Sequence, residues 1–339
     1  MLILLIVRIF INKKRSMKIT KYIVASCFIF SFMACKKDEA TPTSVEEVPE
    51  FTLTDFSRTM MEKPDDNTEI GTVEVSSDAT LDYSYMIESQ SPEDAMKIDE
   101  LTGELQVADG SKFEFNTSPT LTAVVQVTSG VTVQTLNVKL TLRTERDVLV
   151  DMYKMNPNNS FSWDTSSTDI STWSGVTVTD GYVTRMVIYK KNITSIPKEL
   201  GEFRHLSDLA FTDNPLTSVP AELGQLVNLT KLSLLGGELT SVPKELSQLQ
   251  KLETLSLNNN KLTGLPKELS QLTNLKQLFV RINNLTSVPK ELALLTNLEQ
   301  LDLVNNKLTS LPDEICNAFS FDGVTFQKDD EAKCANDIE

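Results

Sequence analysis

Residues 252–274 read LETLSLNNNKLTGLPKELSQLTN, and this pattern decides the fold because it recurs throughout the C-terminal half of the chain. Leucine occupies positions 1, 4, 6 and 11 of the stretch, and proline occupies position 15. Six copies of 23 residues keep this spacing between residues 183 and 315, with Pro197, Pro220, Pro243, Pro266, Pro289 and Pro312 at position 15. A fixed period of this length indicates a repeat protein in which each copy packs on its neighbours.

The spacing of the apolar positions predicts a short strand in every copy. Positions 4 and 6 point to one face of a strand, and positions 1 and 11 fill the same core. One copy cannot bury that core, whereas six stacked copies bury a continuous one behind a curved parallel sheet. Position 9 holds Asn214, Asn260, Asn283 and Asn306, whose amides can satisfy the backbone of the bend that follows the strand. Lys191 and Gly237 replace asparagine in the first and third copies, so we expect looser or differently bonded bends there.

The full pattern, L-x-x-L-x-L-x-x-N-x-L followed by Leu-Pro-x-x-Leu, resembles the Leu-Pro subtype of bacterial leucine-rich repeats over residues 183–315. The resemblance implies an α/β solenoid of six repeats. The prolines suit the first turn of short helices on the outer arc. Residues 148–182 resemble the N-terminal cap of such domains, with Trp163 and Trp173 covering the first repeat. A sugar-stacking role for these tryptophans is the alternative.

Residues 50–147 show no repeat and instead alternate apolar and polar side chains. Leu121 to Val127 and Val131 to Leu142 form two alternating runs on either side of Ser129-Gly130, which predicts a hairpin in a β-sandwich. The segment Ile98-Asp-Glu-Leu-Thr-Gly-Glu-Leu105 resembles the most recognisable part of a cadherin repeat. The resemblance implies an all-β cadherin-like sandwich ahead of the repeats.

Cadherin repeats bind calcium, and two residues here match part of their ligand set. Glu62 matches the early glutamate, and Glu114 lies where a further acidic ligand falls. Thr80 and Arg146 occupy places where a calcium site needs carboxylate oxygens. Calcium takes six to eight oxygen ligands, so a high-affinity site is not expected. Weak calcium binding by Glu62 and Glu114 and ordinary solvated carboxylates are the two alternatives, and no other cofactor is expected.

The N-terminus predicts export. A basic segment at Met17 to Lys21 precedes the apolar residues 22–34, and Ala34 stands directly before Cys35. The stretch resembles a bacterial lipoprotein signal, which implies removal of residues 1–34 and lipidation of Cys35. Residues 35–49 then form a flexible tether, and the protein is expected to be an outer-membrane lipoprotein at the cell surface, held to the membrane by its lipid. An uncleaved membrane span, or lipidation at Cys27 instead, are the alternatives.

In an exported protein the last two cysteines are expected to pair. Cys316 and Cys334 lie 18 residues apart and flank Val324 to Phe326, so we predict a disulfide in a C-terminal cap of residues 316–339. A metal-binding pair is the alternative, but no histidine or second cysteine pair lies nearby to complete a zinc site.

The charge and the inventory of reactive side chains exclude several functions. The formal net charge is −15, and it becomes −21 without residues 1–34, which carry six Lys or Arg and no acid. Such a charge disfavours nucleic-acid binding. The chain has one histidine, His205, and it lacks a Gly-x-Ser-x-Gly, Walker or His-Glu-x-x-His motif. We therefore expect a binding protein and not an enzyme.

Binding is expected on the strand face of the solenoid, at positions that do not serve the core. At positions 5, 7 and 8 the repeats present aromatic, apolar or arginine side chains that folding does not require, namely Tyr189, Leu235, Phe279, Arg281, Ile282 and Val304. Such side chains dominate protein interfaces. We predict that they bind a protein or glycan ligand. Singly exposed apolar residues without a role, and a structural envelope protein without an exchangeable ligand, are the alternatives.

Overall fold

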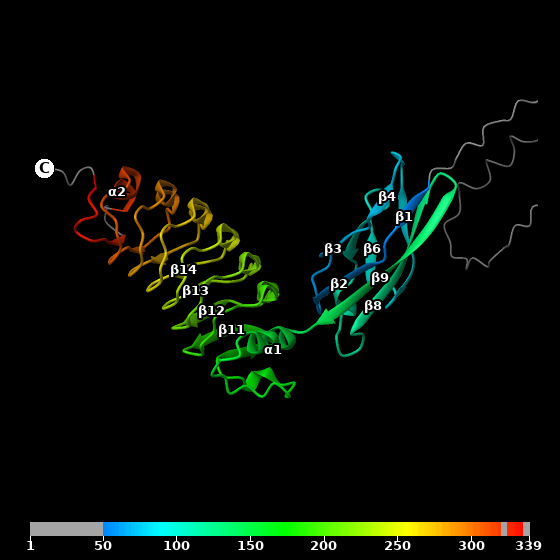
Figure 1. Cartoon of the computed structure of the whole chain (residues 1–339), viewed down its shortest axis with the longest axis horizontal. Helices are drawn as coiled ribbons and strands as arrows, with labels where there is room; N and C mark the ends of the chain where they lie inside the picture. Colours follow the sequence, from blue (N-terminus) through cyan, green and yellow to red (C-terminus); the bar gives the residue numbers. More distant parts are fainter. Residues whose placement is uncertain (1–49, 320–323, 335–339) are drawn as a thin grey trace, which may run out of the picture. The chain divides into compact units, whose positions relative to one another are not determined.

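The computed structural model describes residues 50–319 and 324–334, and Figure 1 shows the course of the chain. The predicted signal segment, the tether and the predicted lipidation site Cys35 lie outside these residues. Within them, one hydrophobic core gathers side chains between Phe51 and Leu142, and a second gathers side chains between Val148 and Cys334.

The first core belongs to an all-β unit of three sheets, formed by strands β1 to β9, and we call this part of the chain the β-unit. A four-stranded sheet has the order β2-β9-β8-β5, a three-stranded sheet the order β3-β7-β6, and β1 pairs with β4. The strands are β1 (Phe51–Leu53), β2 (Phe56–Met61), β3 (Glu69–Thr72), β4 (Val75–Ser77), β5 (Ser84–Ser91), β6 (Met96–Ile98), β7 (Glu104–Val107), β8 (Thr120–Ser129) and β9 (Thr132–Arg143). A short 3-10 helix, η1, covers Gly110–Lys112.

Strands β8 and β9 form the hairpin that the alternating sequence predicts. They pair antiparallel from Thr120↔Thr141 to Ser129↔Thr132. Gly130 lies in the turn with φ of 56°, a left-handed conformation that glycine adopts without strain. The inward side chains of β8 share their core with Leu105 of β7, so the larger sheets pack against each other. A closer likeness to a cadherin repeat stays a prediction.

The second core runs through an eight-stranded sheet in the order β10 to β17 (Figure 1). Its strands are β10 (Val176–Thr179), β11 (Tyr182–Tyr189), β12 (Asp208–Thr212), β13 (Lys231–Ser233), β14 (Thr254–Ser256), β15 (Gln277–Phe279), β16 (Gln300–Asp302) and β17 (Thr325–Gln327). β10 pairs antiparallel with β11, and every later pair is parallel. Leu255 pairs with Leu278, and Leu278 with Leu301, so equivalent positions of successive repeats lie side by side.

A short helix opposite each strand returns the chain to the next repeat. Five are 3-10 helices, namely η3 (Lys198–Glu202), η4 (Ala221–Gln225), η5 (Lys244–Gln248), η6 (Lys267–Gln271) and η7 (Lys290–Leu294). The proline of each repeat is the N-cap residue, and its carbonyl accepts the N–H three residues on, as Pro197 does from Leu200 at 3.1 Å. In the sixth repeat Pro312 precedes the α-helix α2 (Asp313–Phe319). The prolines thus stand just before the helices instead of in their first turn.

The asparagines at position 9 bond the backbone of the preceding repeat as well as their own. Oδ1 of Asn260 accepts the N–H of Leu239, at 3.1 Å, and its Nδ2 donates to the carbonyl of Leu234, at 2.7 Å, both in the third repeat. In the same way Oδ1 of Asn214 accepts the N–H of Lys191, at 2.9 Å, in the first repeat. The bends of the first and third repeats thus keep the bonds from the asparagine of the following repeat and lack the bonds that an asparagine of their own makes, as Asn260 does to the carbonyl of Leu257 at 3.1 Å. They are differently bonded, which is one of the two outcomes expected, but they are not left without an amide partner.

Gly237 affects the second repeat instead. A Cβ at this position would point toward the carbonyl oxygens of Asn214 and Leu216. In that bend the N–H of Leu216 donates to the backbone carbonyl of Asn214, at 2.7 Å. This carbonyl takes the place of the asparagine side chain that accepts the equivalent N–H in other repeats, as Asn260 does from Leu239. At the far end the carboxylate of Asp329 accepts the N–H groups of Asn305 and Asn306, at 2.9 and 3.0 Å, and closes the series.

Both ends of the solenoid are covered. Helix α1 (Glu145–Met155) begins with a capping box between Thr144 and Asp147 and buries its apolar side against the repeats, and a 3-10 turn, η2 (Ile170–Thr172), follows. Trp163 stacks on Trp173 with ring centroids 4.7 Å apart, and both are buried. At the C-terminal end the structure joins Cys316 to Cys334 in a disulfide, and β17 pairs with β16.

Candidate binding face

The strand alternation separates core from face within each repeat. In β15, Leu278 is fully buried while its neighbour Phe279 on the opposite side of the strand is only half-buried. The chain then places Val280 in the core and turns Arg281 and Ile282 outward. The repeat thus presents Phe279, Arg281 and Ile282 together, and we call these three residues the fifth-repeat patch.

The structure brings together some of the six predicted ligand-binding residues and separates others. Val304 of the sixth repeat adjoins the patch, because its carbonyl accepts the N–H of Ile282 at 2.9 Å. Leu235 lies two repeats away and is half-buried. Tyr189 is 52% exposed in the first repeat, where it forms a cation–π contact with Lys190. The predicted set therefore divides into one patch and two isolated positions.

In the described part of the chain the side chain of Arg281 has no charged partner, unlike the side chain of Arg185 on the same sheet. Its neighbours at the same position in the flanking repeats are Asn258 and Val304, which carry no charge. The N–H of Arg281 donates to Oδ1 of Asn258, at 2.7 Å, and this bond fixes the backbone below the side chain. Across residues 50–319 and 324–334 no ion pair involves its guanidinium, whereas Arg185 pairs with Asp208 at 2.8 Å.

Ile282 has an unfavourable backbone conformation. Its φ is 56°, in the left-handed region, and the equivalent residues are left-handed too, namely Lys190, Asp213, Gly236, Asn259 and Asn305. Glycine and asparagine tolerate this conformation, whereas for a β-branched residue it is an outlier that costs about 1–2 kcal/mol. Neighbouring repeats hold the backbone on both sides, because Asn260 N–H donates to the carbonyl of Ile282, at 3.1 Å. The side chain remains 45% exposed, so packing does not explain the isoleucine.

Phe279 stands between a small and an acidic neighbour. Strand pairing places Ser256 on one side of it and Asp302 on the other. Asp302 is buried, and its Oδ1 accepts the N–H of Val304 at 3.0 Å. The burial of Asp302 could not be predicted from the sequence, because a single acid at an outward position gives no signal of burial without knowledge of the neighbouring ring.

The structure does not assemble a ligand set around the two predicted calcium ligands. Oε2 of Glu62 accepts the N–H of Phe115, at 3.0 Å, and Glu114 lies 3.8 Å from the ammonium of Lys63. In the described part of the chain no group of three or more His, Cys, Asp or Glu could hold a metal ion. The prediction of weak calcium binding therefore gains no support from the geometry.

His205, the one histidine of the sequence, lies at the edge of the first repeat. It is exposed and stacks on Tyr182 with ring centroids 3.9 Å apart. Among residues 50–319 and 324–334 no helix has the length and apolar character needed to span a bilayer.

Comparison with known proteins agrees with the repeat geometry. Leucine-rich-repeat family models match residues 227–285 and residues 297–318. No curated protein matches the chain. A leucine-rich-repeat protein of Leptospira interrogans is 40% identical with a TM-score of 0.40, over 42% of this chain and 36% of that one, so this chain spans about a third of its length.

Two other solved structures are similar over part of the chain. The leucine-rich-repeat ectodomain of the receptor kinase SOBIR1 from Arabidopsis thaliana is 25% identical with a TM-score of 0.41, over 49% of this chain and 92% of that one. Extracellular cadherin domains 3–6 of protocadherin gamma B2 are 21% identical with a TM-score of 0.25, over 30% of this chain and 23% of that one. TM-scores this low do not define the fold of the β-unit. The family models and the 23-residue register establish that the C-terminal part of the chain is a leucine-rich-repeat domain.

Proposed function

We propose that this chain is a protein-binding module that recognises its partner through the fifth-repeat patch, with Val304 at its border. Leucine-rich-repeat proteins commonly mediate protein binding, and such domains are generally not enzymes. The observation that carries the proposal is Ile282, which keeps an exposed, β-branched side chain in a left-handed conformation. Strained residues of this kind persist where function favours them.

The chemistry of the patch fits a protein surface better than a sugar. Phe279 and Ile282 offer apolar area, and Arg281 offers a guanidinium that no carboxylate of the described chain engages. Arginine and aromatic side chains are the common hot spots of protein interfaces. A partner with an apolar side chain beside a carboxylate would fill this arrangement, and a glycan is the second candidate to be tested.

The proposed setting is the cell surface. The N-terminal sequence supports export and a lipid on Cys35 of an outer-membrane lipoprotein, with the β-unit as a cadherin-like spacer. The disulfide between Cys316 and Cys334 supports an oxidising compartment. Replacing Cys35 by serine should abolish incorporation of labelled palmitate and release the protein from membranes. If protease added to intact cells leaves the repeats uncut, a structural role inside the envelope replaces the receptor role.

The binding test compares single substitutions of the full chain in a pull-down from envelope and host-cell extracts. Ile282→Asn and Arg281→Ala should each weaken capture of the specific partner by about tenfold or more, the loss typical of a hot spot. Their melting temperatures should not fall. Phe279→Ala should weaken capture as well. Treating the extract with glycosidases separates a glycan ligand from a protein ligand.

Tyr189→Ala is the matched control, because Tyr189 is similarly exposed to Ile282 on the same sheet but lies outside the patch. It should leave capture unchanged. Equal losses for Tyr189→Ala and Ile282→Asn would extend the site to the whole face, and undiminished capture by all patch variants would remove the proposal.

A further inference from the structure

The first repeat departs from the others at the positions where it meets the β-unit. The 3-10 helices of the second, third and fourth repeats end in Gln225, Gln248 and Gln271, whereas that of the first ends in Glu202. Arg204 and His205 follow it, where three of the later repeats place asparagine directly before the next leucine, namely Asn228, Asn274 and Asn297, and the third repeat has Lys251. These substitutions are specific to the repeat that contacts the β-unit.

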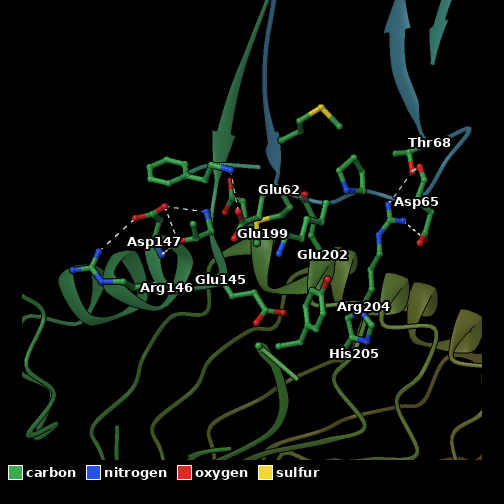
Figure 2. Close-up of a pocket in the computed structure, with 18 of the residues that line it drawn as sticks. Glu62, Asp65, Thr68, Glu145, Arg146, Asp147, Glu199, Glu202, Arg204 and His205 are labelled. Atoms are coloured by element: carbon green, nitrogen blue, oxygen red, sulfur yellow. Dashed lines mark hydrogen bonds and ion pairs between the residues drawn. The ribbon is translucent and has the colours of Figure 1, made fainter. Parts of the chain in front are cut away.

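The altered residues make the contacts (Figure 2). The guanidinium of Arg204 pairs with the carboxylate of Asp65 and donates to Oγ1 of Thr68, at 3.4 Å. The carboxylate of Glu202 accepts the backbone N–H of Met61 at the end of β2. The first repeat is therefore attached to the β-unit by side chains that its own fold does not require.

A third carboxylate lies at the start of helix α1. Oε2 of Glu145 accepts the N–H of Val183, at 2.6 Å, in strand β11. Only Thr144 separates Glu145 from the end of β9 at Arg143, so this bond ties the connection between the two cores to the sheet of the solenoid. In Figure 2 the side chains of Glu62, Glu145, Glu199 and Glu202 gather in the middle of the pocket.

These side chains line a cavity of about 550 Å³. The β-unit contributes the charged groups Arg58, Glu62, Lys63, Asp65 and Glu69. The start of α1 contributes Glu145, Arg146 and Asp147, and Tyr182 of β11 adds a phenol. The first two repeats contribute Lys198, Glu199, Glu202, Arg204, His205 and Glu222.

Most of the basic groups around the cavity are engaged away from Glu145. Arg146 donates to the carbonyls of Ser167 and Thr165, at 2.7 and 2.6 Å, and Arg58 donates to the carbonyl of Glu69, at 3.3 Å. The charge that acts most on Glu145 is the carboxylate of Glu62. A partly buried carboxylate beside another carboxylate, with one N–H as its partner, is better accommodated as the neutral acid.

The electrostatics of both partly buried glutamates agree with this geometry. Burial raises the pKa of Glu145 to about 7; the hydrogen bond from Val183 opposes the rise, and Glu62 adds to it. Burial also raises the pKa of Glu202, against the hydrogen bond from Met61 and the attraction of Arg58 and Arg204. Both groups therefore bind protons more tightly in this closed arrangement than in water.

We propose that the contact between the β-unit and the first repeat is controlled by protons: it is closed while Glu145 and Glu202 are neutral and loosens as they ionise. Because the closed arrangement binds protons more tightly, acid pH favours it. Its extra stability is complete below the ordinary range of a glutamate and is lost as the pH rises to about 7 and beyond. This inference does not depend on the partner of the fifth-repeat patch.

Hydrogen exchange of the full chain tests the proposal at the two amides that these carboxylates accept, Met61 and Val183. After correction for intrinsic exchange, protection at Val183 should fall by about tenfold or more between pH 5.5 and pH 8, as linkage requires for the raised pKa of Glu145. Protection at Met61 should fall in the same direction, because the pKa of Glu202 is also raised. The amide of Leu257, deep in the repeats, should show no such change and serves as the internal reference.

Two substitutions and a control separate the proposal from general destabilisation. Glu202→Gln restores the residue of the later repeats, and Glu145→Gln keeps an oxygen acceptor for Val183 without a charge. Each should reduce the pH dependence, and the double variant should remove it. Glu245→Gln, at a helix position of the third repeat outside the cavity, should behave as wild type. Protection that is independent of pH in the wild type, or an unchanged pH dependence in the double variant, would overturn the proposal.

Discussion

The fourth and fifth repeats share one backbone but differ in what they present. Both place a fully buried leucine in the strand, Leu255 and Leu278, and both place a buried asparagine in the bend, Asn260 and Asn283. Between those fixed points the fourth repeat presents Ser256, Asn258 and Asn259, whereas the fifth presents Phe279, Arg281 and Ile282. Asn259 and Ile282 even adopt the same left-handed conformation, with φ of 55° and 56°.

The comparison separates what stability requires from what it tolerates. The repeated leucines and asparagines satisfy burial and backbone hydrogen bonding, which every copy needs in the same way. The small polar side chains on the face of the fourth repeat show that the fold needs no aromatic, branched or charged side chain there, although Asn258 bonds the N–H of Arg281. The fold therefore does not account for what the fifth repeat presents, and substitutions can test each side of this division.

The largest effect is expected at the shared core. Leu278→Ala should lower the free energy of unfolding by about 2–5 kcal/mol, because it removes buried methyl groups and leaves a cavity. Leu255→Ala should lower it by a similar amount, since the two side chains are equally buried. Denaturant unfolding measures both. A clear difference between them would mean that the two repeats are not equivalent in the core.

A smaller effect is expected at the asparagines, and it should appear one repeat away. Asn283 accepts the N–H of Leu262 and donates to the carbonyl of Leu257, both at 3.0 Å and both in the fourth repeat. Asn283→Ala leaves these buried groups unpaired, at about 1–3 kcal/mol. Hydrogen exchange should therefore quicken at Leu262 more than at Leu285, the equivalent amide of the fifth repeat, which Asn306 accepts. Faster exchange confined to Leu285 would contradict the observation that each asparagine bonds the backbone of the preceding repeat.

The sequence predicts the repeats well because their spacing states a local physical requirement. Leu255 and Leu278 recur at a fixed interval, and proline marks every return helix. The direction in which Asn260 bonds is not visible in the sequence, because a side chain in one repeat reaches a backbone group that is more than twenty residues earlier. The sequence therefore predicts that the first and third bends differ from the others, but it does not show that their backbone is still bonded by the next repeat.

The contact between the β-unit and the first repeat illustrates a second limit. Glu202 and Arg204 read as ordinary variation in an imperfect first copy, and their partners Met61 and Asp65 lie more than a hundred residues away. A signal did exist, because Glu202 replaces a glutamine that three later repeats share. Departures from a repeat consensus that cluster in one copy can thus point to a contact even before its partner is known.

The smallest expected effect is the most informative about function. Ile282→Asn should raise the melting temperature by a few degrees, because asparagine relieves about 1 kcal/mol of left-handed strain. Asn259→Ile should lower it by a similar amount, since it introduces the same strain into the fourth repeat. Thermal unfolding of both variants measures these two shifts of the melting temperature. If Ile282→Asn gives no gain while Asn259→Ile still destabilises, the fifth repeat accommodates isoleucine without strain, and Ile282 no longer supports a binding role.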